Sequence, residues 1–145
     1  MSTQSFLRQL YRVPDFSQSF EGVAVHPYDG RVHGVTRQVR NVHRIITKRD
    51  PGGELWITEV GWASAGPREE NLVKSLDGQA RALRRLFRLL IHRADRWELR
   101  GVYWFAWRDT EPFFEVCEWC GSAGLRYAGG DPKPAYDSLQ RLATR

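Results

Sequence analysis

The sequence predicts an α/β fold with a parallel sheet, on the evidence of its alternating segments and of its loops. Three short apolar strands alternate with three amphipathic helices along the 145 residues. The strands are apolar on both faces, which is typical of parallel strands joined by right-handed helical crossovers. The loops that follow the strands are long and rich in aromatic, charged and glycine residues, so we expect any chemistry at the carboxyl ends of the strands.

The first strand-helix unit is expected in the first third of the chain. Residues 20–26, "FEGVAVH", are short, apolar and β-branched, as in a buried strand. Apolar side chains then recur at helical spacing from Val35 to Ile46, and "RDPGG" at 49–53 ends that helix. A short helix, Phe6 to Val13, is expected before the first strand.

Two more units follow in the same order. "ELWITEV" at 54–60 predicts the second strand, and the apolar stripe from Leu76 to Ile91 predicts the second long helix. "GVYWFAW" at 101–107 predicts the third strand. The closing helix begins at Pro134, because proline is favoured in the first helical turn.

The length limits how much of a barrel the chain can form. A complete (β/α)8 barrel needs about 200 residues or more, whereas this chain of 145 residues has three complete units. We therefore predict a single domain, residues 1–145, that forms a partial (β/α)8 TIM barrel of about the last three strand-helix units.

Composition excludes several classes of function. The net charge is +5, but the arginines are scattered through amphipathic helices and no five like charges stand together. This pattern favours solvated helix faces over a nucleic-acid footprint. No apolar run reaches the roughly 18 residues of a membrane span. The N-terminus "MSTQSFLRQLYRV" lacks the apolar core of a signal peptide, so the sequence leaves the localisation open.

The two cysteines, Cys117 and Cys120, form one C-x-x-C motif. A structural zinc site needs about four ligands, and neither a second C-x-x-C nor a nearby histidine pair supplies them. A thioredoxin-like site is disfavoured because glycine and serine follow the motif at once. We expect a disulfide that closes a loop or two inert thiols, and no metal or cofactor.

Four segments carry a resemblance to a known family. "VAVHPYDG", "LWITEVGWAS", "GVYWFAWRD" and "AGLRYAGGDPKPAYDSL" resemble the last three strands and final helix of a clan-A glycoside hydrolase, a group of retaining (β/α)8 enzymes similar to the cellulases and β-xylosidases. The resemblance covers residues 6–143, and "TEVGW" and the closing "PKPAY" are its most specific parts. It implies a carbohydrate substrate and an extracellular location.

The resemblance also implies roles for three polar residues. Glu59 matches the acid at the end of strand seven, which is the nucleophile of the clan. His26 and Tyr28 match positions after strand six, where a hydrogen-bond donor orients that carboxylate. The alternatives are a Glu59 that caps a loop or pairs with Arg108, and a histidine and tyrosine that only close a turn.

Three tryptophans are candidates for sugar contact, because sugar rings stack on indole faces. They are Trp62, Trp104 and Trp107. Strand alternation would place Trp104 and Trp107 on opposite sides of the third strand, so one of the two would face the barrel axis. Trp107 is nearer the mouth of the barrel, whereas Trp104 matches the clan's strand-eight tryptophan. The alternative for all three is an ordinary place in the core.

The sequence departs from the family at the general acid. The clan places this acid on strand four, in an Asn-Glu pair that is absent here. A retaining mechanism needs two carboxyl groups about 5–5.5 Å apart, and the spacing of the loop acids gives none of them this role. Those acids are Asp29, Asp109, Glu111 and Glu115.

We therefore expect the carboxyl-terminal portion of a retaining glycoside hydrolase, with the nucleophile but without the acid, and inactive alone. The alternative is a non-catalytic carbohydrate-binding module or pseudo-enzyme. Three barrel strands would also expose two strand edges and an apolar inner face, which predicts self-association. The missing strands would all precede Met1, which favours a fragment over a partner half or a decayed remnant.

Overall fold

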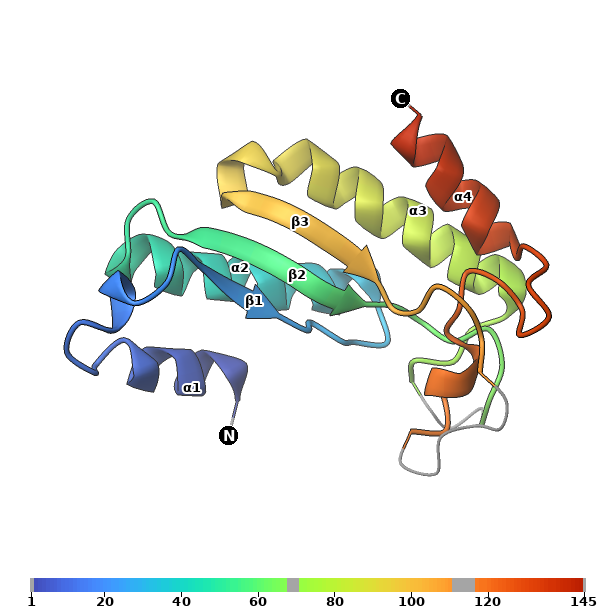
Figure 1. Cartoon of the computed structure of the whole chain (residues 1–145), viewed down its shortest axis with the longest axis horizontal. Helices are drawn as coiled ribbons and strands as arrows, with labels where there is room; N and C mark the ends of the chain where they lie inside the picture. Colours follow the sequence, from blue (N-terminus) through green and yellow to red (C-terminus); the bar gives the residue numbers. More distant parts are fainter. Residues whose placement is uncertain (1, 68–70, 111–116, 145) are drawn as a thin grey trace.

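A computed structural model describes residues 2–67, 71–110 and 117–144, and it contains the predicted parallel sheet. The strands lie in the order β1, β2, β3, and the helices follow them in alternation (Figure 1). The strands are β1 (Gly22–Val25), β2 (Glu54–Val60) and β3 (Leu99–Trp104). The helices are α1 (Thr3–Leu10), α2 (Val32–Arg49), α3 (Leu76–Arg93) and α4 (Pro134–Ala143).

The core lies between the sheet and the two long helices. In Figure 1, α2 lies behind the strands and α3 runs alongside β3, and α4 packs on α3. Leu55 and Ile57 of β2 are completely buried, as are Val35 and Val39 of α2 and Leu83 of α3. Each such side chain stabilises the fold by about 1.5–3 kcal/mol. None of the helices in the described ranges is long and apolar enough to span a membrane.

The third strand differs from its predicted range of 101–107. β3 begins at Leu99 and ends at Trp104. From Ala106 onwards the chain leaves β2 and pairs with a later segment. The Ala106 backbone N–H donates to the Ala123 carbonyl, and the Leu125 N–H donates back to the Ala106 carbonyl. The apolar and aromatic pattern of residues 101–107 carries no information about which segment these residues pair with.

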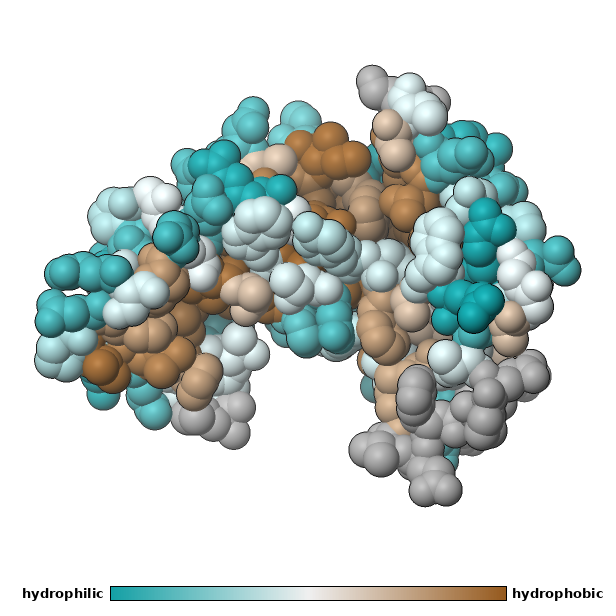
Figure 2. Space-filling view, in the orientation of Figure 1, coloured by the Kyte–Doolittle hydropathy of each residue, from teal (hydrophilic) through white to brown (hydrophobic). Residues whose placement is uncertain are grey.

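The inner face of the sheet is mixed and not wholly apolar as predicted, because charged and polar side chains lie there beside Trp56 and Tyr103. Arg100 of β3 forms an ion pair with Glu54 of β2 at 3.0 Å. Thr58 and Tyr103 are exposed on these same strands. Over the strands, Figure 2 is mostly pale and teal, and its brown atoms lie around α1 and also near α3 and α4. Alternation along these strands therefore separates a buried outer face from a solvated inner one.

The two outer strands, β1 and β3, each pair on one side only with a strand of the described sheet. Unpaired edges are templates for pairing with another chain. Self-association through these edges stays a prediction.

A buried ion pair fixes the start of α4. Lys133, which is 1% exposed, lies 2.6 Å from a carboxylate oxygen of Asp109. The same ammonium donates to Ser64 Oγ at 2.8 Å and to the Ser122 carbonyl at 3.1 Å. Lys133 thus joins the loop after β2, the loop after β3 and the final helix. This contact explains the lysine of the "PKPAY" segment.

A hydrogen bond from Tyr11 to Asp50, 3.5 Å long, links the ends of α1 and α2. Burial, followed by the charge of Asp50, raises the pKa of Tyr11 to about 12. Because the folded chain holds this proton more tightly, we expect the contribution of Tyr11 to stability to be complete below about pH 10 and lost towards pH 12. Urea unfolding of wild type and Tyr11→Phe should therefore differ at pH 9 and converge at high pH. A difference that grew with pH would contradict this assignment.

Candidate active site

Glu59 lies at the carboxyl end of β2, where two side chains from the loop after β1 reach it. The Tyr28 hydroxyl donates to Glu59 Oε2 at 2.9 Å. His26 Nδ1 lies 3.4 Å from the same oxygen. The Glu59 side chain is 38% exposed, so these contacts orient the carboxylate and leave it open to a ligand. The alternative pairing with Arg108 is not observed among the described residues.

The second ring nitrogen of His26 also contacts a residue of β2. His26 Nε2 lies 3.0 Å from the hydroxyl of Thr58, the residue before Glu59. The two contacts together hold the His26 ring between Thr58 and Glu59. β2 thus supplies both the carboxylate and the group that orients its histidine.

Tyr28 is a persistent donor to Glu59. Burial, followed by the hydrogen bond to the Glu59 carboxylate, raises the pKa of Tyr28 well above its usual value. The phenol therefore keeps its proton throughout the neutral range. A neutral donor at this distance steadies the orientation of a carboxylate without neutralising its charge.

Two aromatic residues that sequence reasoning missed surround Tyr28. The Trp119 ring lies 5.2 Å from the Tyr28 ring, and Phe105 lies 5.8 Å from Trp119. Phe105 also meets Tyr28 edge-on at 6.5 Å. We call Tyr28, Phe105 and Trp119 the aromatic wall. Alternation from the outward-facing Trp104 could have indicated Phe105, but no sequence signal placed Trp119.

Trp62 and Trp104 belong to the packing beneath the site. Trp62 is completely buried and its indole N–H donates to the Asp29 carbonyl at 2.8 Å. Trp104 is partly buried between Trp62 and Phe87 of α3, with its indole N–H on the Ala123 carbonyl. A fully buried indole offers no face to a sugar, so the alternative of a core residue holds for Trp62. The same packing turns Trp104 towards the helices.

Trp107 lies beyond the end of β3, so the strand argument for its orientation fails. Its side chain is 61% exposed and meets Tyr136 of α4 at 5.8 Å. The Arg126 guanidinium stacks over the rings of both residues. Trp107 therefore joins the start of α4, whereas the aromatic wall lies with Tyr28. A sugar contact by Trp107 stays a prediction.

The glycine of "TEVGW" has a local structural reason. The Phe105 carbonyl lies against Gly61, where any side chain would collide with it. The Phe105 backbone N–H in turn donates to the Val60 carbonyl at 3.0 Å. This close approach brings the residue after β3 next to the end of β2. It is how Phe105 comes to stand beside the site.

The loop acids that the structure describes are engaged elsewhere. Asp109 is paired with Lys133, and Asp29 accepts from the backbone N–H of Arg31 at 2.9 Å. Glu111 and Glu115 lie outside the described residues. Within the described ranges no three histidine, cysteine or acidic side chains form a cluster that could hold a metal. Cys117 and Cys120 form a disulfide with a Cα–Cα distance of 5.4 Å, which is one of the two predicted states.

Comparisons with known proteins give matches in structure alone. No protein-family model matches the chain, and no curated protein matches it. Among solved structures, GH5_18 from Bifidobacterium longum subsp. longum in complex with Manb1-4GlcNAc superposes with a TM-score of 0.67 and 18% identity. The match covers 86% of this chain and 30% of that one.

Two further structures agree with this result. A GH2 β-galacturonidase from Eisenbergiella tayi bound to galacturonate gives a TM-score of 0.61 at 22% identity, over 83% of this chain and 23% of that one. The catalytic core of xylanase A gives 0.64 at 13% identity, over 97% and 45%. The chain thus spans less than half of each of these three structures. The predicted likeness is confirmed at the level of the fold: the chain has the fold of part of a (β/α)8 barrel.

Proposed function

We propose that the chain is the carboxyl-terminal portion of a retaining glycoside hydrolase and that Glu59 is its nucleophile. The observation that supports this most is the arrangement at the end of β2. A half-open carboxylate there is held by Tyr28 and His26 and lies beside the aromatic wall. The neighbours named above include proteins bound to a mannose-containing disaccharide and to galacturonate, which supports a carbohydrate ligand.

The proposed chemistry uses one carboxylate of the usual two. Glu59 would attack the anomeric carbon, the bond to the leaving oxygen would break, and a glycosyl ester would form. An ordinary leaving group must also receive a proton from a general acid. The described residues offer Glu59 no partner carboxylate for this step. The proposed role of this chain is therefore to supply the nucleophile to a larger barrel.

A reagent that needs no general acid tests the nucleophile directly. Fluoride leaves an activated sugar without receiving a proton, so 2-deoxy-2-fluoroglycosyl fluorides can form the ester even where the acid is missing. We expect the full chain, treated with the gluco, manno, xylo and glucurono reagents, to gain one sugar on the peptide that contains Glu59, measured by mass spectrometry. Glu59→Gln should abolish the adduct.

The matched control is Glu54→Gln, which removes a carboxylate from the same strand where it pairs with Arg100. This variant should keep the adduct. Labelling that persisted in Glu59→Gln, or no labelling with any of these reagents, neutral or acidic, would contradict the proposed nucleophile. Saccharide binding without labelling would favour the alternative of a non-catalytic carbohydrate-binding module.

A further inference from the structure

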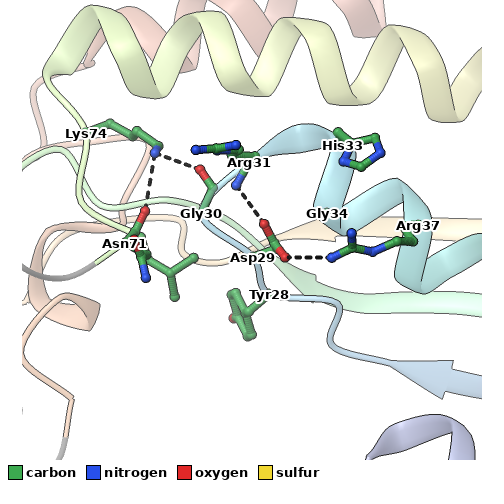
Figure 3. A pocket seen from close by; sticks show the side chains of 10 residues that line it. Tyr28, Asp29, Gly30, Arg31, His33, Gly34, Arg37, Asn71 and Lys74 are labelled. Carbon is green, nitrogen blue, oxygen red and sulfur yellow. Dashed lines mark hydrogen bonds and ion pairs between the residues drawn. The ribbon is translucent and has the colours of Figure 1, made fainter.

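A cavity of about 720 Å³ opens next to the proposed site. Its walls are residues 28–37, after β1, and residues 71–74, after β2 (Figure 3). Both segments follow the carboxyl ends of their strands, so the cavity lies at the same end of the sheet as Glu59. Its volume is within the range of about 300–1,000 Å³ that small-molecule sites occupy.

The lining of this cavity is positively charged. Arg31, Arg37 and Lys74 each contribute a cation, and Asp29 is the one carboxylate among the lining residues. In Figure 3 the Arg31 side chain lies between Lys74 and His33. The cavity therefore has a net positive lining of charged groups from two separate loops.

Asp29 is part of the cavity wall and does not neutralise the other cations. Its carboxylate accepts from the Arg31 backbone N–H at 2.9 Å and lies 4.0 Å from the Arg37 guanidinium. It also sits against Gly34 in the first turn of α2, where a side chain would collide with it. Asp29 thus occupies the start of the helix itself. An external anion would meet the side chains of Arg31 and Lys74 instead.

Two backbone carbonyls hold the Lys74 ammonium in place. The ammonium donates to the Gly30 carbonyl at 2.7 Å and to the Asn71 carbonyl at 3.3 Å. Both acceptors are backbone carbonyls, and an ammonium has three N–H donors, so one donor remains for a ligand. The two carbonyls position this charge at the junction of the two loops.

Tyr28 connects the cavity to the proposed nucleophile. Tyr28 is one of the lining residues and its hydroxyl donates to Glu59, while Figure 3 shows its side chain pointing away from Arg31 and Lys74. A substituent of a sugar bound at Glu59 would therefore have to extend past Tyr28 to reach Arg31 and Lys74. A cavity with a positive lining favours a substituent of opposite charge.

From this arrangement we infer that the saccharide is acidic, with a carboxylate or sulfate ester that occupies the cavity lined by Arg31, Arg37 and Lys74. The inference rests on the proposed function, because it names the class of sugar for that same site. The shared chemistry is a monoanionic oxygen group on a sugar ring, which guanidinium and ammonium donors recognise by charge-assisted hydrogen bonds.

Titration of the full chain with three matched probes tests the inference. The probes are methyl glucuronide, methyl glucoside 6-sulfate and methyl glucoside, followed by nuclear magnetic resonance of the backbone amides. We expect at least one anionic probe to bind about tenfold or more tightly than the neutral one, since charged hydrogen bonds carry this much affinity. The shifts should fall on residues 28–37 and 71–74. Comparison of the affinities for methyl glucuronide and for methyl glucoside 6-sulfate distinguishes a uronic acid from a sulfate ester.

Charge-matched variants separate the cavity from the general positive charge. Arg31→Gln with Lys74→Gln should lose the preference for the anionic probe. Arg85→Gln with Arg88→Gln removes the same charge from α3, outside the cavity lining, and should keep it. If Lys74→Gln unfolds the chain, Arg31→Gln with Arg37→Gln replaces the first pair. Equal affinity for the neutral probe, or an equal loss in both pairs, would overturn the inference.

The outcome is independent of the labelling of Glu59. An adduct on Glu59 without any anionic preference would overturn the acidic substrate and leave the proposed function in place. An anionic preference localised to the cavity, without an adduct, would support the cavity as an anion site and contradict the nucleophile.

Discussion

Replacement of Lys133 by methionine is expected to lower the free energy of unfolding by about 3–5 kcal/mol. The lysine ammonium is almost fully buried and lies 2.6 Å from Asp109, whose side chain is 13% exposed. Burial lowers the pKa of Lys133, and the Asp109 carboxylate opposes this shift. Without the ammonium, Asp109 would remain as an uncompensated charge in a largely dry site. Urea unfolding followed by tryptophan fluorescence measures the loss.

Two further variants identify the cause of this loss. Lys48→Met removes the same charge from an exposed position on α2 and should leave stability nearly unchanged. Lys133→Met combined with Asp109→Leu should recover part of the stability, because no charge then stays buried without a partner. A loss of less than about 1 kcal/mol in Lys133→Met would show that the pair contributes little to the fold.

The chain is expected to react with activated glycosides about 10²–10⁴-fold faster than with ordinary ones, which is the usual contribution of a general acid. Glycosyl fluorides and dinitrophenyl glycosides lose their leaving groups without a proton, whereas methyl glycosides require one. A chain that supplies the nucleophile without the acid should therefore discriminate between them. Release of fluoride or dinitrophenolate, compared with release of methanol, measures the ratio.

Cleavage of methyl glycosides at a comparable rate would mean that the chain contains its own acid. The loop residues Glu111 and Glu115, outside the described part of the chain, would then be the first positions to replace by glutamine. A loss of methyl glycoside cleavage in one variant, with reactivity towards the fluoride retained, would assign the acid to that residue.

The elements that the sequence predicts best are those whose packing follows local periodicity. β2 matches its predicted range of 54–60, and the stripe from Leu76 to Ile91 lies within α3. Both have one face against the core, so the burial pattern is present in the order of the residues. The end of β3 was missed because the partner of residues 106–109 is the distant segment 123–126, and spacing carries no record of such pairing.

The same distinction applies to the candidate site. Glu59, His26 and Tyr28 follow adjacent parallel strands, whose carboxyl ends meet at one edge, so their proximity was predictable. Trp119 comes instead from a disulfide-closed loop that is remote in sequence from all three. Its position depends on tertiary contacts, and these cannot be read from the spacing of neighbouring residues.

The ion pair between Glu54 and Arg100 bears on how such a half barrel can exist in water. The charged pair reduces the apolar surface that the inner face exposes, although Trp56 and Tyr103 lie on the same face. We expect that the sheet can form first and accept neighbours later, edge by edge. Assembly of a larger barrel would then require the added strands to pair in the correct register. The hydrophobic core between the sheet and the helices would already be formed.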